Sequence, residues 1–197
     1  MKKIMFNDAL GLTQAVLEGR KTQTRREIKC PRTQHGIDVA GFEVHKFSTG
    51  FREVVAMDFD GMEIGALEPT YKIGEVVAIA QSYKDISPYK GHNGYSNHRD
   101  LAAGWNNKMF VKAYRMLHHI RITDIRVERL QDISVEDCYA EGISYHGTRT
   151  DGLNFTYDNS NFFATAKDAY QALINKLDKK MWERNPFVFV YEFELMD

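Results

Sequence analysis

The sequence predicts an α+β fold, a small mixed and mostly antiparallel β-barrel with about three flanking helices. Segments with the apolar patterns of strands outnumber those with helical spacing. Strands and helices show no regular βαβ alternation, which argues against a doubly wound parallel sheet. One long predicted strand changes the phase of its apolar–polar alternation. A β-bulge produces such a change, and bulges let a long strand bend around a small barrel. With 197 residues and no internal repeat or linker-like segment, residues 1–197 are expected to form one domain.

The chain is expected to open with a short strand over residues 4–6. Asn7 is a residue type that caps helices, and the apolar spacing after it predicts a helix over 8–18. Gly19 suits the position just past the helix end, because glycine readily adopts the left-handed backbone found there. The cationic run Lys21–Arg26 therefore begins directly after a well-defined helix end.

Most of the predicted strands lie in the middle of the chain. Residues 42–47 and 52–57 flank a Ser-Thr-Gly turn and indicate a hairpin. Residues 75–80 have few polar breaks, which is typical of a buried strand. In the long strand over 119–130, the apolar positions change from even to odd near Thr123. A shift of one residue predicts a β-bulge at that point.

Two further helices and a closing strand complete the pattern. Ser134 and Asp137 form a helix-start signature, and the helix they open is expected to end at Gly142. Apolar residues at helical spacing predict a third helix over about 162–178. Residues 187–195 alternate in the way of a half-buried strand. Three polar stretches are read as insertions in the domain: about 33–70, 83–108 and 144–161.

Composition places the chain among ordinary soluble proteins. It is 43% apolar and 27% charged, and no window approaches the roughly 20 apolar residues of a membrane helix. A cytoplasmic protein with no membrane partner is expected, and its two distant cysteines are expected to be free thiols. The net charge of −1 argues against a non-specific nucleic-acid coat. Residues 1–33 nevertheless hold eight Lys and Arg against three acids, which indicates a local positive patch.

The segment after the first helix carries the clearest chemistry. Lys21 stands three residues before Thr24, inside a run of arginines. A lysine amine with a lowered pKa accepts a proton from a hydroxyl, and the hydroxyl then becomes a nucleophile. The flanking guanidinium groups would hold a phosphate or carboxylate. On a strand, only Arg26 shares the face of Thr24, so Arg26 rather than Arg25 is expected beside it.

Four segments, in this order and spacing, resemble the ASCH-domain family, most closely its longer bacteriophage and prophage members. They are Gly19–Arg26, Tyr71–Val77, Val127–Ile143 and Trp182–Phe193. The resemblance implies a PUA-like β-barrel and binding of RNA or a modified nucleoside. One bacterial branch of the family looks like an amidohydrolase that acts on N4-acetylcytidine.

The resemblance also assigns site residues. The lysine, threonine and glutamate of the amidohydrolase branch fall on Lys21, Thr24 and Glu141. The chain departs from the family where an Arg-Glu-Thr-Trp-like segment usually follows the buried strand, since Ala80–Tyr83 stands there instead. Either this chain binds its ligand differently from the family or Tyr83 takes over the contacts. The aromatic side chains of the 83–108 stretch have two interpretations: they stack on an unpaired base, or they pack the stretch onto its own domain, which is the commoner case.

Three functions stay open at this stage. The first is RNA or nucleoside binding in a basic cleft lined by Lys21, Thr24, Arg26 and Glu141, with Arg20 and Tyr83 as further ligand-binding residues. The second is deacylation of an N4-acetylcytidine-like nucleoside by the same triad, and the third is a protein-interaction module. A purely structural Lys21–Glu141 ion pair is a fourth interpretation of the same residues. The histidines show no metal-ligand spacing and no phosphate-binding glycine loop is present, so no metal and no cofactor are expected. The oligomeric state is left open.

Overall fold

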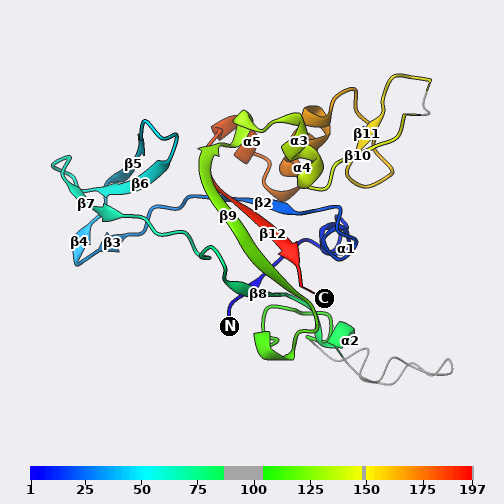
Figure 1. The fold of residues 1–197 in the computed structure, drawn as a ribbon, viewed down its shortest axis with the longest axis horizontal. Coiled ribbons are helices and arrows are strands. Elements are labelled where there is room, and N and C mark those ends of the chain that lie inside the picture. Colours follow the sequence, from blue (N-terminus) through cyan, green and yellow to red (C-terminus); the bar gives the residue numbers. More distant parts are fainter. Residues whose placement is uncertain (87–103, 148–149, 197) are drawn as a thin grey trace.

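The computed structural model describes residues 1–86, 104–147 and 150–196, and its centre is a five-stranded sheet of order β1-β8-β9-β12-β2 (Figure 1). Its strands are β1 (Lys3–Ile4), β8 (Val76–Ile79), β9 (His119–Arg129), β12 (Phe187–Leu195) and β2 (Gln23–Glu27). β1 runs parallel to β8, whereas the other neighbours are antiparallel. The mixed, mostly antiparallel α+β class is therefore confirmed. In the described residues no backbone ladder joins β1 to β2, the two edges of the sheet.

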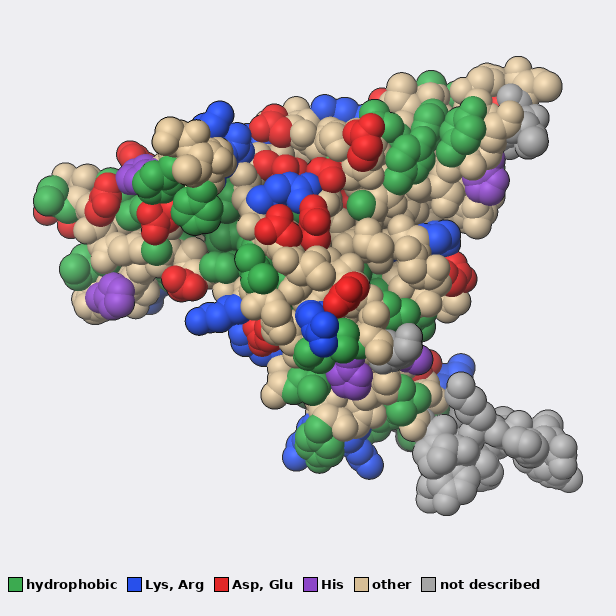
Figure 2. All heavy atoms as spheres, viewed as in Figure 1, with side chains coloured by type: hydrophobic (Ala, Val, Ile, Leu, Met, Phe, Trp, Pro, Cys, Tyr) green, Lys and Arg blue, Asp and Glu red, His purple; other side chains and the backbone are tan. Residues whose placement is uncertain are grey.

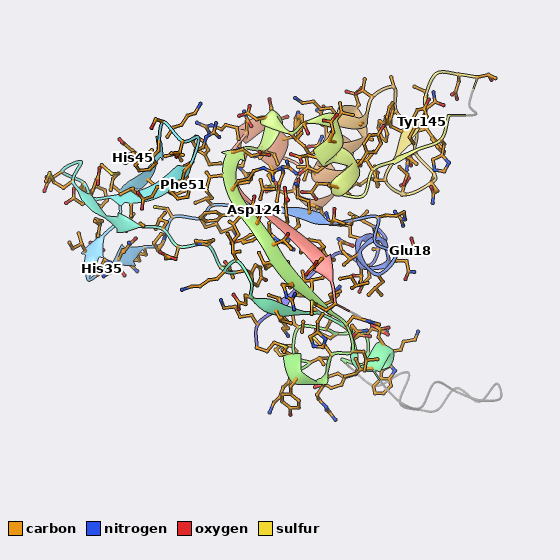
Figure 3. The ribbon with its side chains drawn as sticks, in the orientation of Figure 1. Glu18, His35, His45, Phe51, Asp124 and Tyr145 are labelled. Atoms are coloured by element: carbon orange, nitrogen blue, oxygen red, sulfur yellow. The ribbon has the colours of Figure 1, made fainter. Side chains whose placement is uncertain are left out.

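The long strand β9 contains the predicted bulge. Glu192 of β12 pairs with Asp124, and the next residue, Phe193, pairs with Ile122. Thr123 is therefore the extra residue, and the faces of β9 exchange at that point, as the change of alternation predicted. In Figure 1 β9 curves strongly along its length, and Figure 3 labels Asp124 near the middle of the bend. The closing strand also lies where it was predicted.

Residues 33–70, predicted to be an insertion, form small sheets beside the main one. They comprise β3 (Thr33–Gln34) with β4 (Ile37–Asp38), and β5 (Gly41–Lys46) with β6 (Arg52–Met57) and β7 (Glu63–Ala66). The predicted hairpin is present as β5 and β6, whereas β7 was not predicted. Val54 of β6 is buried with Ile28 and Val127. This apolar contact joins the small sheets, at the left of Figure 1, to the main sheet.

The three predicted helices are present, and two one-turn helices, α2 and α5, were not predicted. The helices are α1 (Leu12–Leu17), α2 (Tyr83–Ile86), α3 (Val135–Ala140), α4 (Ala166–Leu177) and α5 (Met181–Arg184). The other elements of the described residues are the 3₁₀ turns η2 (Ala113–Arg115) and η3 (Leu130–Asp132) and the strands β10 (Ser144–Tyr145) and β11 (Phe155–Thr156). Ser134 caps α3 by accepting a hydrogen bond from the Asp137 amide, as predicted. No described helix is long and apolar enough to span a bilayer.

The start of the first helix was predicted wrongly. Asn7 does accept a hydrogen bond, from the Leu10 amide at 3.2 Å, but it caps a turn and not the helix. Gly11, with φ of +67°, separates that turn from α1, which begins at Leu12. The first strand is also shifted, to Lys3–Ile4. Of the 83–108 stretch, residues 87–103 lie outside the described residues, so the stacking role predicted for the aromatic side chains there is not addressed.

Candidate functional site

A cleft of about 480 Å³ lies between the two edges of the main sheet and is called the seam cleft here. On one side it is lined by the chain that leaves β1 and on the other by β2 and the loop before it. Its residues are Met5, Phe6, Asn7, Asp8, Ala9, Leu12, Lys21, Thr24, Arg25, Arg26, Lys108, Glu141, Tyr170, Leu173, Ile174 and Leu177. Arg26 bridges the seam, because its Nη2 donates to the Met5 carbonyl at 2.6 Å. Lys21, Thr24, Arg26 and Glu141, predicted to share a cleft, are therefore brought together.

Lys21 is buried in the floor of the cleft and is fully hydrogen-bonded. Its Nζ donates to the Gln23 carbonyl at 2.7 Å, to the Glu141 carbonyl at 3.0 Å and to Oε2 of the Glu141 carboxylate. Three acceptors match the three protons of an ammonium group. Burial lowers the pKa of Lys21, and the Glu141 carboxylate opposes this effect without cancelling it.

The loop that carries Lys21 is held between two helices. The Lys21 amide donates to the Ala15 carbonyl of α1 at 2.9 Å, and the Thr22 amide donates to the Ala140 carbonyl of α3 at 2.8 Å. Gly142, just past α3, has φ of +101°, and a Cβ there would lie 3.5 Å from the Lys21 Cβ. The predicted glycine at this helix end thus allows close approach of the lysine to α3.

Thr24 lies on the opposite face of β2 from Arg25. It pairs with Tyr191 of β12, and its side chain is buried except for the part that borders the seam cleft. The Thr24 hydroxyl forms no hydrogen bond within the part of the chain that the structure describes. Lys21 bonds to Glu141 and not to Thr24, so the three triad residues share a cleft while the proton path between lysine and threonine is not formed.

Arg25 contributes to the site although the alternation placed it on the other face. It does point to the helix side of β2, where it pairs with Val190 in the ladder. Its long side chain nevertheless reaches Glu141 Oε1, with Nη1 at 3.1 Å. The guanidinium also binds Glu128 at 2.6 Å and Asp137 at 2.8 Å. Strand alternation fixes the face of a residue but not the reach of an arginine, which is why this contact was missed.

Lys21 and Arg25 belong to a larger ion-pair network on this face of the sheet. Arg126 of β9 binds Asp137 at 2.7 Å and Glu128 at 3.4 Å, and also contacts Glu192. Figure 2 shows Lys and Arg side chains ringed by Asp and Glu side chains above β9. Burial and the surrounding charges have opposing effects on the arginines, and the carboxylates prevail, raising the pKa of Arg25 and of Arg126. The network ties β2, β9 and β12 to α3.

The other predicted ligand-binding residues lie elsewhere. Arg20 is exposed and pairs with Glu18, which Figure 3 shows on the outer side of α1, and it does not line the seam cleft. Tyr83 begins α2, where Ser82 and Asp85 cap each other across one helical turn. Tyr83 packs against a small buried cluster that includes Val111. The structure therefore does not bring Arg20 or Tyr83 to the triad residues.

The walls of the seam cleft differ in chemistry. One wall is apolar and comes mainly from α4, through Leu173, Ile174 and the Tyr170 ring. At the mouth, Arg26 is exposed and its guanidinium carbon lies 5.9 Å from the Phe6 ring centre. The floor is charged through the buried Lys21 and Glu141. A cleft with one apolar wall and one polar side suits a flat ring with a hydrogen-bonding edge.

No group of three or more His, Cys, Asp and Glu residues in the described part of the chain is arranged to hold a metal ion. Comparison with protein-family models, with curated proteins and with solved structures gives no match for this chain.

Proposed function

We propose that this protein is an ASCH-like, PUA-like barrel that binds RNA or a modified nucleoside by taking one base into the seam cleft. The observation that carries the proposal is that Lys21, Thr24 and Arg26, from one short segment, line one cleft of about 480 Å³ together with Glu141, which lies 120 positions after Lys21. The curved, bulged strand β9 and the Arg26 bridge between the sheet edges support the barrel interpretation.

The cleft offers a matching partner for each part of a nucleotide. The apolar wall formed by α4 would stack on the base, while the Thr24 hydroxyl would exchange a hydrogen bond with its polar edge. Arg26, exposed at the mouth, would hold a phosphate or ribose oxygen. The volume falls within the range of roughly 300–1,000 Å³ that is usual for small-molecule sites.

The hydrogen bonds that Lys21 donates favour ligand binding over catalysis. All three protons of its ammonium group are donated to protein oxygens. A general base must instead accept a proton from the nucleophile across a hydrogen bond. In the described residues Lys21 forms no hydrogen bond with Thr24, and this resting geometry supports ligand binding more than proton transfer.

Deacylation of an N4-acetylcytidine-like nucleoside is the second candidate. It is favoured by a threonine hydroxyl without a protein partner in the described residues, beside a lysine whose pKa burial lowers. Neutral Lys21 would take the Thr24 proton while the oxygen attacks the acetyl carbonyl, and would return that proton to the departing cytidine amine. Water positioned by Glu141 would then hydrolyse the acyl-threonine to acetate.

Calorimetric titration of cytidine and N4-acetylcytidine tests the first candidate, and chromatography of the products tests the second. Thr24→Val keeps the side-chain shape and removes the hydroxyl, so it is expected to weaken nucleoside binding several-fold. The matched control is Thr22→Val, because Thr22 is exposed and does not line the cleft.

The outcomes separate the candidates. Binding without product formation supports the binding function. Cytidine release that is lost in both Thr24→Val and Lys21→Ala supports the amidohydrolase. Equal nucleoside affinity of the Thr24→Val and Thr22→Val variants would show that the seam cleft is not the site. Absence of binding to nucleosides and to RNA would leave the protein-interaction function as the better proposal.

A further inference from the structure

A second surface lies next to the seam cleft, where the chain between β8 and β9 meets the N-terminus. It surrounds a hollow of about 750 Å³ lined by residues 1–3, 70–71 and 109–114. We call it the lysine–aromatic face. The residues that define it are Lys2, Lys3, Met109, Phe110, Lys112, Tyr114 and Arg115. Lys3 fixes its shape, because Nζ donates to the carbonyls of Lys108 at 3.2 Å and Val111 at 3.0 Å.

Cations predominate on this face, although Lys2 forms an ion pair with Glu75 at 3.1 Å. The sequence from 108 to 123 contains four Lys and Arg and no Asp or Glu. Lys112 and Arg115 are exposed, and within the described residues neither forms an ion pair with an acid. At the lower tip of the molecule in Figure 2, Lys and Arg side chains flank hydrophobic ones. A net charge of −1 for the whole chain makes this local excess of positive charge a specific feature.

Large aromatic side chains stand between these cations. Phe110 and Tyr114 are each 74% exposed, and the Lys112 ammonium lies 5.9 Å from the Tyr114 ring centre. Exposed aromatic rings lie here among cations such as Lys112 and Arg115, which have no acidic partner in the described residues. This combination suits single-stranded nucleic acid, because bases stack on the rings while phosphates bind the cations.

Two consecutive residues, Lys108 and Met109, connect the seam cleft to the lysine–aromatic face. Lys108 lines the cleft, where its Nζ binds Asp8 at 2.9 Å and the Phe6 carbonyl. The next residue, Met109, already lines the hollow of the second surface. An RNA strand that places one nucleotide in the seam cleft can therefore continue along residues 109–115.

We propose that the lysine–aromatic face binds the stretch of single-stranded RNA next to the nucleotide held in the seam cleft. The inference rests on the proposed binding function and extends it from one base to a track. Lys112 and Arg115 contact phosphates, and Phe110 and Tyr114 stack on bases.

Fluorescence anisotropy of a labelled single-stranded RNA dodecamer, measured over a range of salt concentrations, tests the proposal. Each phosphate contact contributes about −0.7 to the slope of log K against log salt for single strands. The double variant Lys112→Ala/Arg115→Ala is expected to make the slope less steep by about 1.4. The matched control is Arg32→Ala/Lys46→Ala, which removes one arginine and one lysine from the small sheets, where both are exposed.

A second pair of variants tests whether RNA bases stack on Phe110. Phe110→Ala is expected to weaken RNA binding about fivefold or more, as the loss of one stacked base does. Phe59→Ala is the matched control, because Phe59 is 80% exposed and lies in the β6–β7 turn. All substituted side chains are exposed, and the urea midpoint of each variant checks that folding is unchanged.

Nucleoside titrations on the same variants distinguish this inference from the proposed function. Unchanged N4-acetylcytidine affinity with weakened RNA binding supports the track. An RNA affinity and salt slope equal to those of the controls would overturn it, even where nucleosides bind. Binding to vesicles of anionic phospholipid, with no binding to RNA, would also overturn it and identify the face as a membrane contact.

Discussion

Replacing Glu141 by glutamine removes the charge that neutralises two buried cations. The Lys21 and Arg25 side chains are 2% and 1% exposed, and that of Glu141 is 5% exposed. Glutamine keeps the shape and the backbone carbonyl that Lys21 also binds, so the substitution changes the charge and leaves the packing nearly intact. Arg25 keeps Glu128 and Asp137 as partners, whereas Lys21 loses the one carboxylate that it binds within the described residues.

The expected cost follows from this geometry. Removing one member of a buried ion pair costs about 3–5 kcal/mol, because a charge is left uncompensated away from water. The remaining partners of Arg25 and the amide oxygen of glutamine favour the lower limit, about 3 kcal/mol. With a slope of about 2 kcal/mol per molar urea, the unfolding midpoint is expected to fall by about 1.5 M.

A double-mutant cycle in urea isolates the pair. Lys21→Met removes the cation but keeps an apolar chain of similar length, so Lys21→Met/Glu141→Gln buries no unpaired lysine. The double variant is expected to be destabilised by at least about 1 kcal/mol less than the sum of the single variants. The control is Arg121→Met, which breaks an ion pair with Glu194 at 3.3 Å in which both side chains are about half exposed. That substitution should cost no more than about 1 kcal/mol.

The reasoning would be refuted if Glu141→Gln cost no more than Arg121→Met, or if the two substitutions in the cycle were additive. Either result would mean that water reaches the Lys21–Glu141 pair in solution. A solvated pair would also remove the reason for the lowered pKa of Lys21, and with it the main support for the amidohydrolase candidate.

Three other predictions concern the surroundings of the site. Gly142→Ala should destabilise the fold by about 1–3 kcal/mol and weaken nucleoside binding, because φ of +101° strains an alanine beside Lys21; urea unfolding and calorimetry measure both effects. Burial by itself would raise the pKa of the Asp137 carboxyl. Its hydrogen bonds and ion pairs, led by the hydrogen bond from Gln23, outweigh burial and hold the pKa below its ordinary value. The stabilisation from this carboxylate should therefore be complete above about pH 5 and be lost as the pH falls through its folded pKa; Asp137→Asn should flatten the acid side of a stability–pH profile. Burial raises the pKa of Cys138 to about 12, so a thiol reagent at pH 8 should label only the exposed Cys30 in the folded protein and both thiols in urea.

Local patterns were sufficient for much of the fold. The hairpin of β5 and β6, the cap at Ser134 and the bulge at Thr123 depend on neighbouring residues, and all three were predicted. The start of α1 was not, because the positive φ of Gly11 outweighed the capping tendency of Asn7. Short strands such as β7 carry too few residues for a periodic signal.

By itself, the sequence determined the strand faces and the chemical character of the cationic segment, because both depend on residue type and short spacing. Only the tertiary structure decided which groups meet. Lys21 and Glu141 are 120 positions apart, yet they form a buried pair that occupies the lysine protons. Tyr83 was placed away from the cleft by a helical turn that its neighbours cap. Contacts across such separations depend on how the elements pack and how far long side chains reach, and neither is encoded in local periodicity.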